Sequence, residues 1–170
     1  MLLRFTGAML VIAGCGGVGF RLAASYRQEE KSLQQLLGIL DYMECELQYR
    51  LTPWPVLCTE AAREFPGIPG RVMGALASEL ETQITPDIGC CMRSVLCRSK
   101  NIPSFTEKLL LEFGRSVGRF DLQGQLKALD SVRQDCRRYL AQFRDNREHR
   151  LRSYQTLGLC AGAALAILFV

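Results

Sequence analysis

The fold is decided by the C-terminal stretch, residues 121–170, which reads DLQGQLKALDSVRQDCRRYLAQFRDNREHRLRSYQTLGLCAGAALAILFV. In its first half, apolar residues recur every three or four positions, which places them on one face of a helix: Leu122, Leu126, Leu129, Val132, Cys136, Leu140 and Phe143. Residues 144–150 are mostly charged, and residues 153–170 carry no charge. We therefore predict one long helix that packs in a soluble bundle and then enters a membrane.

The uncharged C-terminal segment, residues 153–170, is close to the shortest length that spans a bilayer. A hydrocarbon core of ~30 Å needs about 20 helical residues that rise 1.5 Å each. Small residues recur every fourth position there, at Gly158, Gly162 and Ala166, and Ala13 and Gly17 share this spacing. Such rows let two helix backbones approach closely. We predict that these rows form a contact surface, a packing seam, between helices in the membrane. The alternative is that glycine and alanine are simply common in membrane helices.

The N-terminal segment, residues 1–20, is rich in glycine and carries a single charge, Arg4. It fits a membrane helix whose Arg4 reaches the interface. The run from Ile12 to Cys15 also fits a lipoprotein signal with a lipidated Cys15. That alternative would place a lipid-anchored helical protein outside the cell. We favour the membrane helix.

The same segment contains a match to a dinucleotide-binding motif between Gly14 and Gly19, and Asp41 follows at about the expected distance. A nucleotide-dependent enzyme built on this motif is therefore an alternative function. The motif requires a parallel sheet around it, however. Every later segment has helical periodicity instead.

Composition excludes several kinds of site. The net charge of +4 is too small to indicate nucleic-acid binding. The eight cysteines lack the spacing of a zinc site, and His149 is the only histidine. We expect reduced cysteines, no metal, no cofactor, no catalytic residues and no small-molecule substrate. Five acidic residues of the helix predicted over residues 23–51 are expected on a solvated face: Glu29, Glu30, Asp41, Glu44 and Glu46.

The middle of the chain predicts one long helix and four shorter ones. The long helix covers residues 23–51, with a buried stripe of Leu33, Leu36, Leu37, Leu40, Met43 and Leu47. Short helices are expected after Thr52-Pro53, Ile68-Pro69-Gly70, Thr85-Pro86 and Pro103. Thr52 and Thr85 are predicted helix caps, and Ser104 with Glu107 is a predicted capping box. Trp54 is a predicted core anchor.

These elements predict an all-α antiparallel bundle of about six helices, with a membrane helix at each end. The expected boundaries are residues 1–21 and 153–170 for the membrane helices and 22–152 for the bundle. Basic residues flank the bundle side of both spans, so the bundle should be cytoplasmic. The expected interfacial collar consists of Arg21, Arg144, Arg147, Arg150 and Arg152.

Two stretches resemble a known family. The first is residues 36–49, LLGILDYMECELQY, followed by Thr52-Pro53. The second is residues 111–118, LEFGRSVG, followed by Asp121, Gln125 and Leu129. Together with the charged helix that runs into an apolar C-terminus, they are similar to the stage III sporulation protein AB family of endospore-forming bacteria.

The resemblance implies a non-enzymatic platform in a channel complex that crosses the envelope between mother cell and forespore. The bundle is similar to the inner-membrane platform protein of type II secretion and type IV pilus machines. The implied partners are a secretion-type ATPase, the stage III sporulation protein AA, other membrane subunits of the complex, and the bilayer. The bundle would lie on the mother-cell side.

Overall fold

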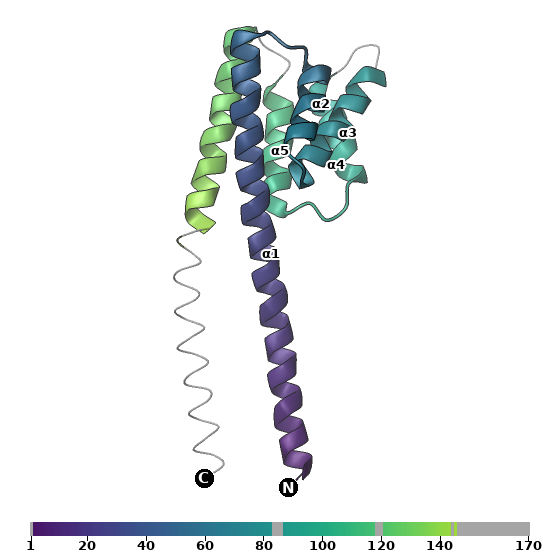
Figure 1. Ribbon diagram of the computed structural model, residues 1–170, viewed down its shortest axis with the longest axis vertical. Coiled ribbons are helices and arrows are strands. Elements are labelled where there is room, and N and C mark those ends of the chain that lie inside the picture. Colours follow the sequence, from purple (N-terminus) through teal and green to yellow (C-terminus); the bar gives the residue numbers. More distant parts are fainter. Residues whose placement is uncertain (1, 83–86, 118–120, 144, 146–170) are drawn as a thin grey trace.

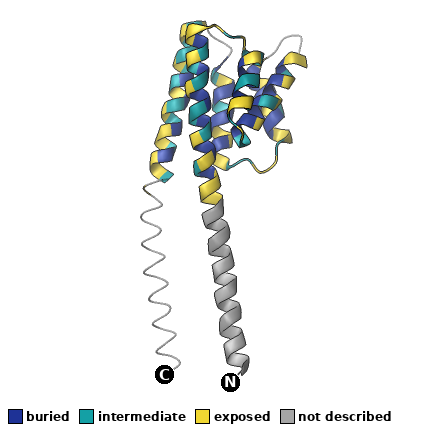
Figure 2. Ribbon diagram, in the orientation of Figure 1, coloured by how far each residue is buried: buried dark blue, intermediate teal, exposed yellow. Residues whose placement is uncertain are grey.

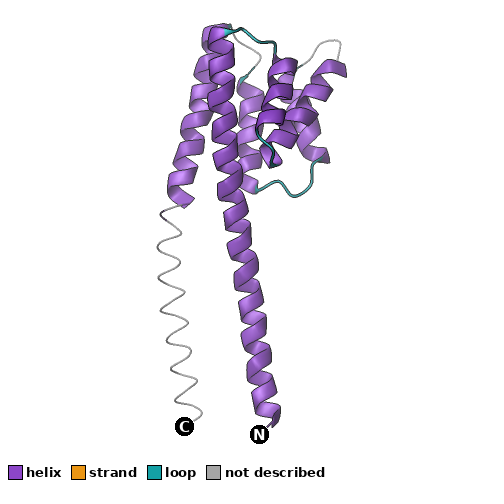
Figure 3. Cartoon of the chain, viewed as in Figure 1, coloured by secondary structure: helices purple, strands orange, loops and turns teal. Residues whose placement is uncertain are grey.

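The computed structural model of the 170-residue chain describes residues 2–82, 87–117, 121–143 and 145, with side chains from Ser25 onward. Five labelled helices are α1 (Leu2–Tyr49), α2 (Trp54–Glu64), α3 (Ile68–Thr82), α4 (Ile88–Arg98) and α5 (Ser104–Ser116). Residues 122–143 form a sixth, which we call the last helix. Figure 3 shows no strand among the described residues. The expected all-α bundle of about six helices is confirmed.

Helix α1 is longer than expected, because it continues without a break from Leu2 to Tyr49 over 48 residues. A boundary was expected near residue 21, between the apolar segment and the bundle. No proline occurs before Pro53, and the residues around the expected boundary favour a helix, so nothing ends it there. At 1.5 Å per residue, α1 is about 72 Å long.

The bundle occupies the C-terminal half of α1 (Figure 1). The last helix runs antiparallel beside α1, while α2 to α5 pack together on another side of it. The N-terminal half of α1 extends beyond the bundle. The last helix ends on that same side, so we call this end of the bundle the terminal end and the opposite end the far end.

A single core joins all six helices, and Figure 2 shows buried residues on every helix of the bundle. The predicted stripe of α1 is confirmed, with only Leu37 partly buried. Leu129, Val132, Cys136 and Leu140 of the last helix are buried as expected. Trp54 is half-buried and packs its ring edge-on against buried Phe113, at 6.0 Å between ring centroids. Sequence periodicity thus identified the buried faces correctly.

Two glycines allow close approach between elements. A Cβ at Gly114 of α5 would lie 2.7 Å from the Cβ of Met92 in α4, which is closer than packing permits. A Cβ at Gly70 would collide with the main-chain oxygen of Phe65 in the turn between α2 and α3. The close packing of α4 against α5 therefore depends on the missing side chain of Gly114.

Helix capping differs from the sequence prediction. Thr52 does not cap α2; its hydroxyl donates to Glu46 Oε2 at 3.2 Å, and Pro53 occupies the cap position. Pro103 occupies the cap position of α5 without a side-chain cap, so Ser104 and Glu107 form no capping box. Asp87 caps α4 by accepting from the main-chain N–H groups of Gly89 and Cys90. Thr85 lies outside the described residues.

No helix in the described part of the chain is both long enough and apolar enough to cross a membrane. The two segments expected to do so, residues 1–21 and 153–170, lie outside the residues whose side chains the structure describes.

Candidate functional site

The terminal end of the bundle is held together by a buried carboxylate. Glu29 of α1 is only 7% exposed, and its Oε1 accepts from the main-chain N–H of Thr106 at 2.9 Å and from the Thr106 hydroxyl at 3.1 Å. Thr106 lies in the first turn of α5, where main-chain N–H groups have no partner within the helix. Glu29 therefore caps α5 from a different helix, and the expectation that it faces solvent is wrong.

A second set of acidic residues holds the last helix to α1. The Arg133 guanidinium donates to Asp41 Oδ1 at 3.4 Å and to Glu44 of α1, and also to Asp130 of its own helix. Arg137 lies 4.0 Å from Asp41. Asp41 is exposed, as expected, but Glu44 is partly buried and paired. These carboxylates join two helices and do not form a catalytic pair.

Arg133 stays charged in this arrangement. Burial by itself would lower its pKa, but the hydrogen bond to Asp130 and the nearby carboxylates of Glu44 and Asp41 outweigh this effect and raise the pKa. Its Nε is buried and has no hydrogen-bond partner among the described residues. The guanidinium is therefore held mainly by its two terminal nitrogens.

Four aromatic rings from α1, α5 and the last helix meet at the terminal end. Phe143 packs edge-on against Tyr26 at 5.9 Å and against Phe105 at 5.3 Å, and Phe105 lies 5.0 Å from Tyr139. The Lys108 ammonium donates to the Tyr139 hydroxyl at 3.0 Å, which raises the pKa of Lys108. We call Tyr26, Phe105, Tyr139 and Phe143 the aromatic end.

The far end exposes a different set of apolar side chains. Tyr49 and Leu51 follow one another closely at the end of α1, and Val56 lies in the first turn of α2; they are 77%, 64% and 46% exposed. Leu51 also has a φ of 52°, a left-handed conformation that is unfavourable for a leucine. The far end thus combines exposed apolar surface with local backbone strain.

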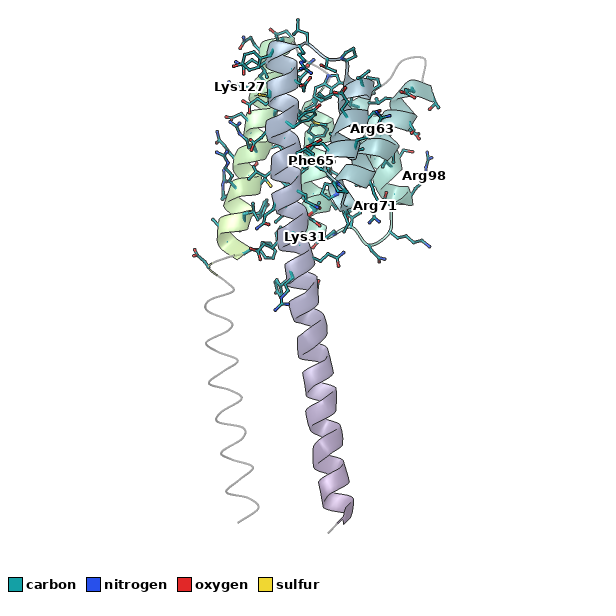
Figure 4. All side chains as sticks on the ribbon, viewed as in Figure 1. Lys31, Arg63, Phe65, Arg71, Arg98 and Lys127 are labelled. Carbon is teal, nitrogen blue, oxygen red and sulfur yellow. The ribbon has the colours of Figure 1, made fainter. Side chains whose placement is uncertain are left out.

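An open hollow of ≈ 440 Å³ lies between the end of α5 and the last helix. It is lined by Arg115, Ser116, Gly124, Lys127, Ala128 and Ser131. The label of Lys127 in Figure 4 marks its position toward the far end, while Lys31 lies toward the terminal end. Its described lining carries two exposed cations, Arg115 and Lys127.

The buried cysteines are poor nucleophiles. Burial raises the pKa of Cys58 and of Cys136 to about 12 and also raises that of Cys91. The Cys136 thiol donates to the main-chain oxygen of Leu33 at 3.2 Å, so it acts as a small core side chain. Across the described residues, no group of histidine, cysteine and acidic side chains could hold a metal ion.

Comparison with known proteins identifies the family. A sequence profile described as stage III sporulation protein AB matches residues 4–170. The chain belongs to the stage III sporulation protein AB family. A solved structure titled "Stage III sporulation protein AB (SpoIIIAB)" is 17% identical and superposes with a TM-score of 0.60. That alignment covers 72% of this chain and 98% of the solved one, which shows the shared fold. No curated protein matches.

Membership of the stage III sporulation protein AB family ties the chain to sporulation. The resemblance based on residues 36–49 and 111–118 is confirmed. Both stretches belong to elements that carry the core: Leu36, Leu40 and Met43 are buried in α1, and Phe113 is buried in α5. Their role in this family member is therefore to build the bundle.

The predicted site residues mostly lie beyond what the structure describes. Ala13, Gly17 and Arg21 belong to the part of α1 whose side chains are not described. The remaining predicted residues lie outside the described residues: Gly158, Gly162, Ala166, Arg144, Arg147, Arg150 and Arg152. Glu29, Arg133 and the aromatic end were not predicted as a site, because their contacts join residues far apart in the chain.

The dinucleotide-binding alternative is wrong for this family member. The motif between Gly14 and Gly19 requires a strand that ends in a tight glycine turn before a helix. Residues 2–49 are instead one continuous helix, so neither the strand nor the turn is present. The lipid-anchor alternative concerns the Cys15 side chain, which is not described.

Proposed function

We propose that this protein is a non-enzymatic membrane platform in the channel complex that links mother cell and forespore, and that it docks a secretion-type ATPase, the stage III sporulation protein AA. The observation that carries the proposal is the course of α1, which runs unbroken from the bundle into the apolar N-terminal segment. The last helix ends at the same terminal end, directly before the basic and then uncharged C-terminal sequence.

In the proposed topology, residues 1–21 and 153–170 cross the membrane and residues 22–152 form the cytoplasmic bundle on the mother-cell side. Both spans would leave the bundle at its terminal end, which is consistent with the arrangement of α1 and the last helix. The collar of Arg21, Arg144, Arg147, Arg150 and Arg152 would then lie at the cytoplasmic headgroups, where basic residues are favoured.

The two spans are proposed to pack through their small residues. Gly158, Gly162 and Ala166 recur every fourth position, as do Ala13 and Gly17. Close backbone contact is the main source of helix association in lipid. Gly162→Ile keeps the segment apolar, so it should insert normally while crosslinking between the spans falls. Unchanged crosslinking would contradict the seam.

A role without catalysis is supported by the structural contacts of the carboxylate and thiol side chains. Glu29 and Glu44 are engaged in joining helices, and the thiols of Cys58 and Cys136 are buried with raised pKa values. The exposed apolar residues at the far end support a docking role, because that end faces away from the proposed membrane. Proposed contacts for the ATPase are Tyr49, Leu51 and Val56.

The test is co-purification of the ATPase with the full-length protein from sporulating cells, after brief crosslinking. We expect the protein to remain in membranes after carbonate extraction and to capture the ATPase together with other membrane subunits. Release by carbonate would contradict the membrane topology. Retention in the membrane without ATPase capture would contradict the partner.

Docking of the ATPase at the far end is tested separately by introducing a charge there. Val56→Glu should fold, since Val56 is 46% exposed, yet should reduce ATPase capture at least tenfold. The matched control is Arg71→Glu, which changes an exposed residue on α3 away from the proposed contacts. An equal loss of capture in both variants would contradict docking at the far end.

A further inference from the structure

The aromatic end exposes apolar surface that its internal packing does not use. Five large hydrophobic residues of the described chain are exposed, and two of them, Tyr26 at 39% and Phe105 at 37%, lie here. Both rings contact Phe143, and each keeps more than a third of its surface exposed to solvent. Rings fixed in this way present a preformed apolar surface that water solvates poorly.

The position of this surface matches the depth of a membrane interface. Tyr26 lies five residues after Arg21, the last residue of the proposed first span, which is about 7.5 Å along a helix. Phe143 lies at the corresponding end of the last helix. The headgroup region on each side of the hydrocarbon core is roughly 5–8 Å thick. An upright α1 would therefore place the aromatic end within the headgroups.

The charges around the aromatic end favour an anionic surface. Its exposed basic residues come from α1, from the loop after α4 and from α5: Arg27, Lys31, Lys100 and Lys108. Opposing them are exposed Glu107 and Asp145 and half-buried Glu30, Glu112 and Asp135, the last of which is paired with Arg138. The Lys108 ammonium lies beyond the Tyr139 hydroxyl, to which it donates at 3.0 Å, so a cation and a tyrosine hydroxyl are presented together. Lysine with tyrosine is a common combination at lipid headgroups.

We propose that the aromatic end is a lipid-binding surface: Tyr26 and Phe105 enter the headgroup layer of the bilayer, and the nearby lysines and Arg27 bind anionic phospholipid headgroups. The folded bundle is then seated on the membrane and is not merely tethered to it by its spans. This inference rests on the proposed membrane topology.

The experiment uses the only tryptophan of the chain, Trp54. Trp54→Phe removes it, and Phe105→Trp in that background places a single fluorophore at the proposed contact. The full-length protein is reconstituted in nanodiscs of mixed zwitterionic and anionic phospholipid, with or without bromine near the top of the acyl chains. We expect blue-shifted emission and at least twofold quenching by the brominated lipid.

The matched control is Val56→Trp in the same background, which reports from the far end. It should show emission typical of water and no quenching. Tyr26→Trp provides a second probe of the aromatic end in case Phe105→Trp alters the fold, which circular dichroism would reveal. Quenching that is equal at Phe105→Trp and Val56→Trp, or absent from both probes of the aromatic end, would overturn the proposal.

The outcomes separate this inference from the proposed function. If the protein fails to stay in nanodiscs, the membrane topology itself is wrong. If it stays but the aromatic-end probes show blue-shifted emission without bromine quenching, another protein or a second copy covers this surface, and lipid binding is refuted. If nanodiscs of purely zwitterionic lipid give the same quenching, the proposed role of the basic residues is refuted.

Discussion

Glu29 and Thr106 lie 77 positions apart in the chain, yet the carboxylate of one accepts two hydrogen bonds from the other. We predict that Glu29→Ala lowers the free energy of unfolding by about 1–3 kcal/mol, because a buried N–H and a buried hydroxyl lose their acceptor. Thermal unfolding of the full chain in detergent, followed by circular dichroism, measures the loss. Glu107 is exposed and lies in the same turn of α5 as Thr106, so Glu107→Ala should change the free energy of unfolding little. Equal losses of stability in the two variants would contradict the capping role of Glu29.

Leu51 combines a left-handed backbone with an exposed side chain. Glycine adopts this conformation without steric cost, so Leu51→Gly should raise stability by up to about 1 kcal/mol. The same change should weaken capture of the proposed ATPase partner if the leucine side chain is a contact. Stability and capture are therefore expected to move in opposite directions, and a parallel loss of both would contradict this interpretation.

Tyr42 and two buried cysteines should make the stability of the fold depend on pH. Burial and the hydrogen bond from its hydroxyl to Glu60 raise the pKa of Tyr42 from 10.0 to about 12, and burial raises those of Cys58 and Cys136 from 9.0 to about 12. The folded state therefore holds these protons more tightly than the unfolded state. Their contribution to stability is complete below about pH 9 and is lost as the pH rises toward 12.

We therefore predict that the free energy of unfolding falls steeply on the alkaline side, and that Tyr42→Phe makes this fall shallower. Chemical denaturation of the full chain at a series of alkaline pH values measures both. Tyr49→Phe, which alters a tyrosine that is 77% exposed, should leave the pH dependence unchanged. The prediction fails if Tyr42→Phe and Tyr49→Phe give the same profile.

At the scale of elements, α4 and α5 are spaced by Gly114. A methyl group there would lie 2.7 Å from the Met92 Cβ, so the two helices would have to separate. Gly114→Ala should destabilise the bundle by about 1–3 kcal/mol, although alanine is the better helix former. The adjacent exposed Arg115→Ala is the control and should have little effect on thermal unfolding. A gain in stability at Gly114 would show that the helices can separate freely.

Whether a feature could be predicted from the sequence depends on how far apart in the chain its interacting residues lie. The buried stripe of α1, including Leu36, Leu40 and Met43, depends on spacing within one helix, so periodicity was sufficient to predict it. The role of Glu29 depends on a residue in another helix, and so does the pairing of Glu44 with Arg133, 89 positions away. Local pattern cannot reveal such partners, and these carboxylates therefore looked like a solvated face.

The N-terminal caps of the helices were also predicted incorrectly, although they involve only neighbouring residues. Thr52 and Ser104 have the residue type of caps, but the cap position lies one residue away from each of them, at a neighbouring proline. Pro53 and Pro103 take the cap position, and Thr52 bonds to Glu46 instead. The helices were predicted correctly while their first hydrogen bonds were not.

At the scale of the whole molecule, the continuity of α1 can be tested directly. Ser25 is exposed and lies between the apolar segment and the bundle. Ser25→Pro removes one main-chain hydrogen bond and kinks the helix. We expect the proposed membrane insertion and the thermal transition of the bundle to persist, while assembly of the proposed channel complex falls sharply. Ser25→Ala is the control, and normal assembly with Ser25→Pro would show that continuity is dispensable.

The unbroken course of α1 has a mechanical consequence. A helix of about 72 Å that starts in the apolar segment and ends at the far end acts as a lever. Glu29 fastens α5 to α1 and Arg133 fastens the last helix to α1, so we expect the bundle to turn together with α1. We expect a force applied at Tyr49 by the proposed partner to reach the opposite end of α1, within the proposed membrane span, as torque.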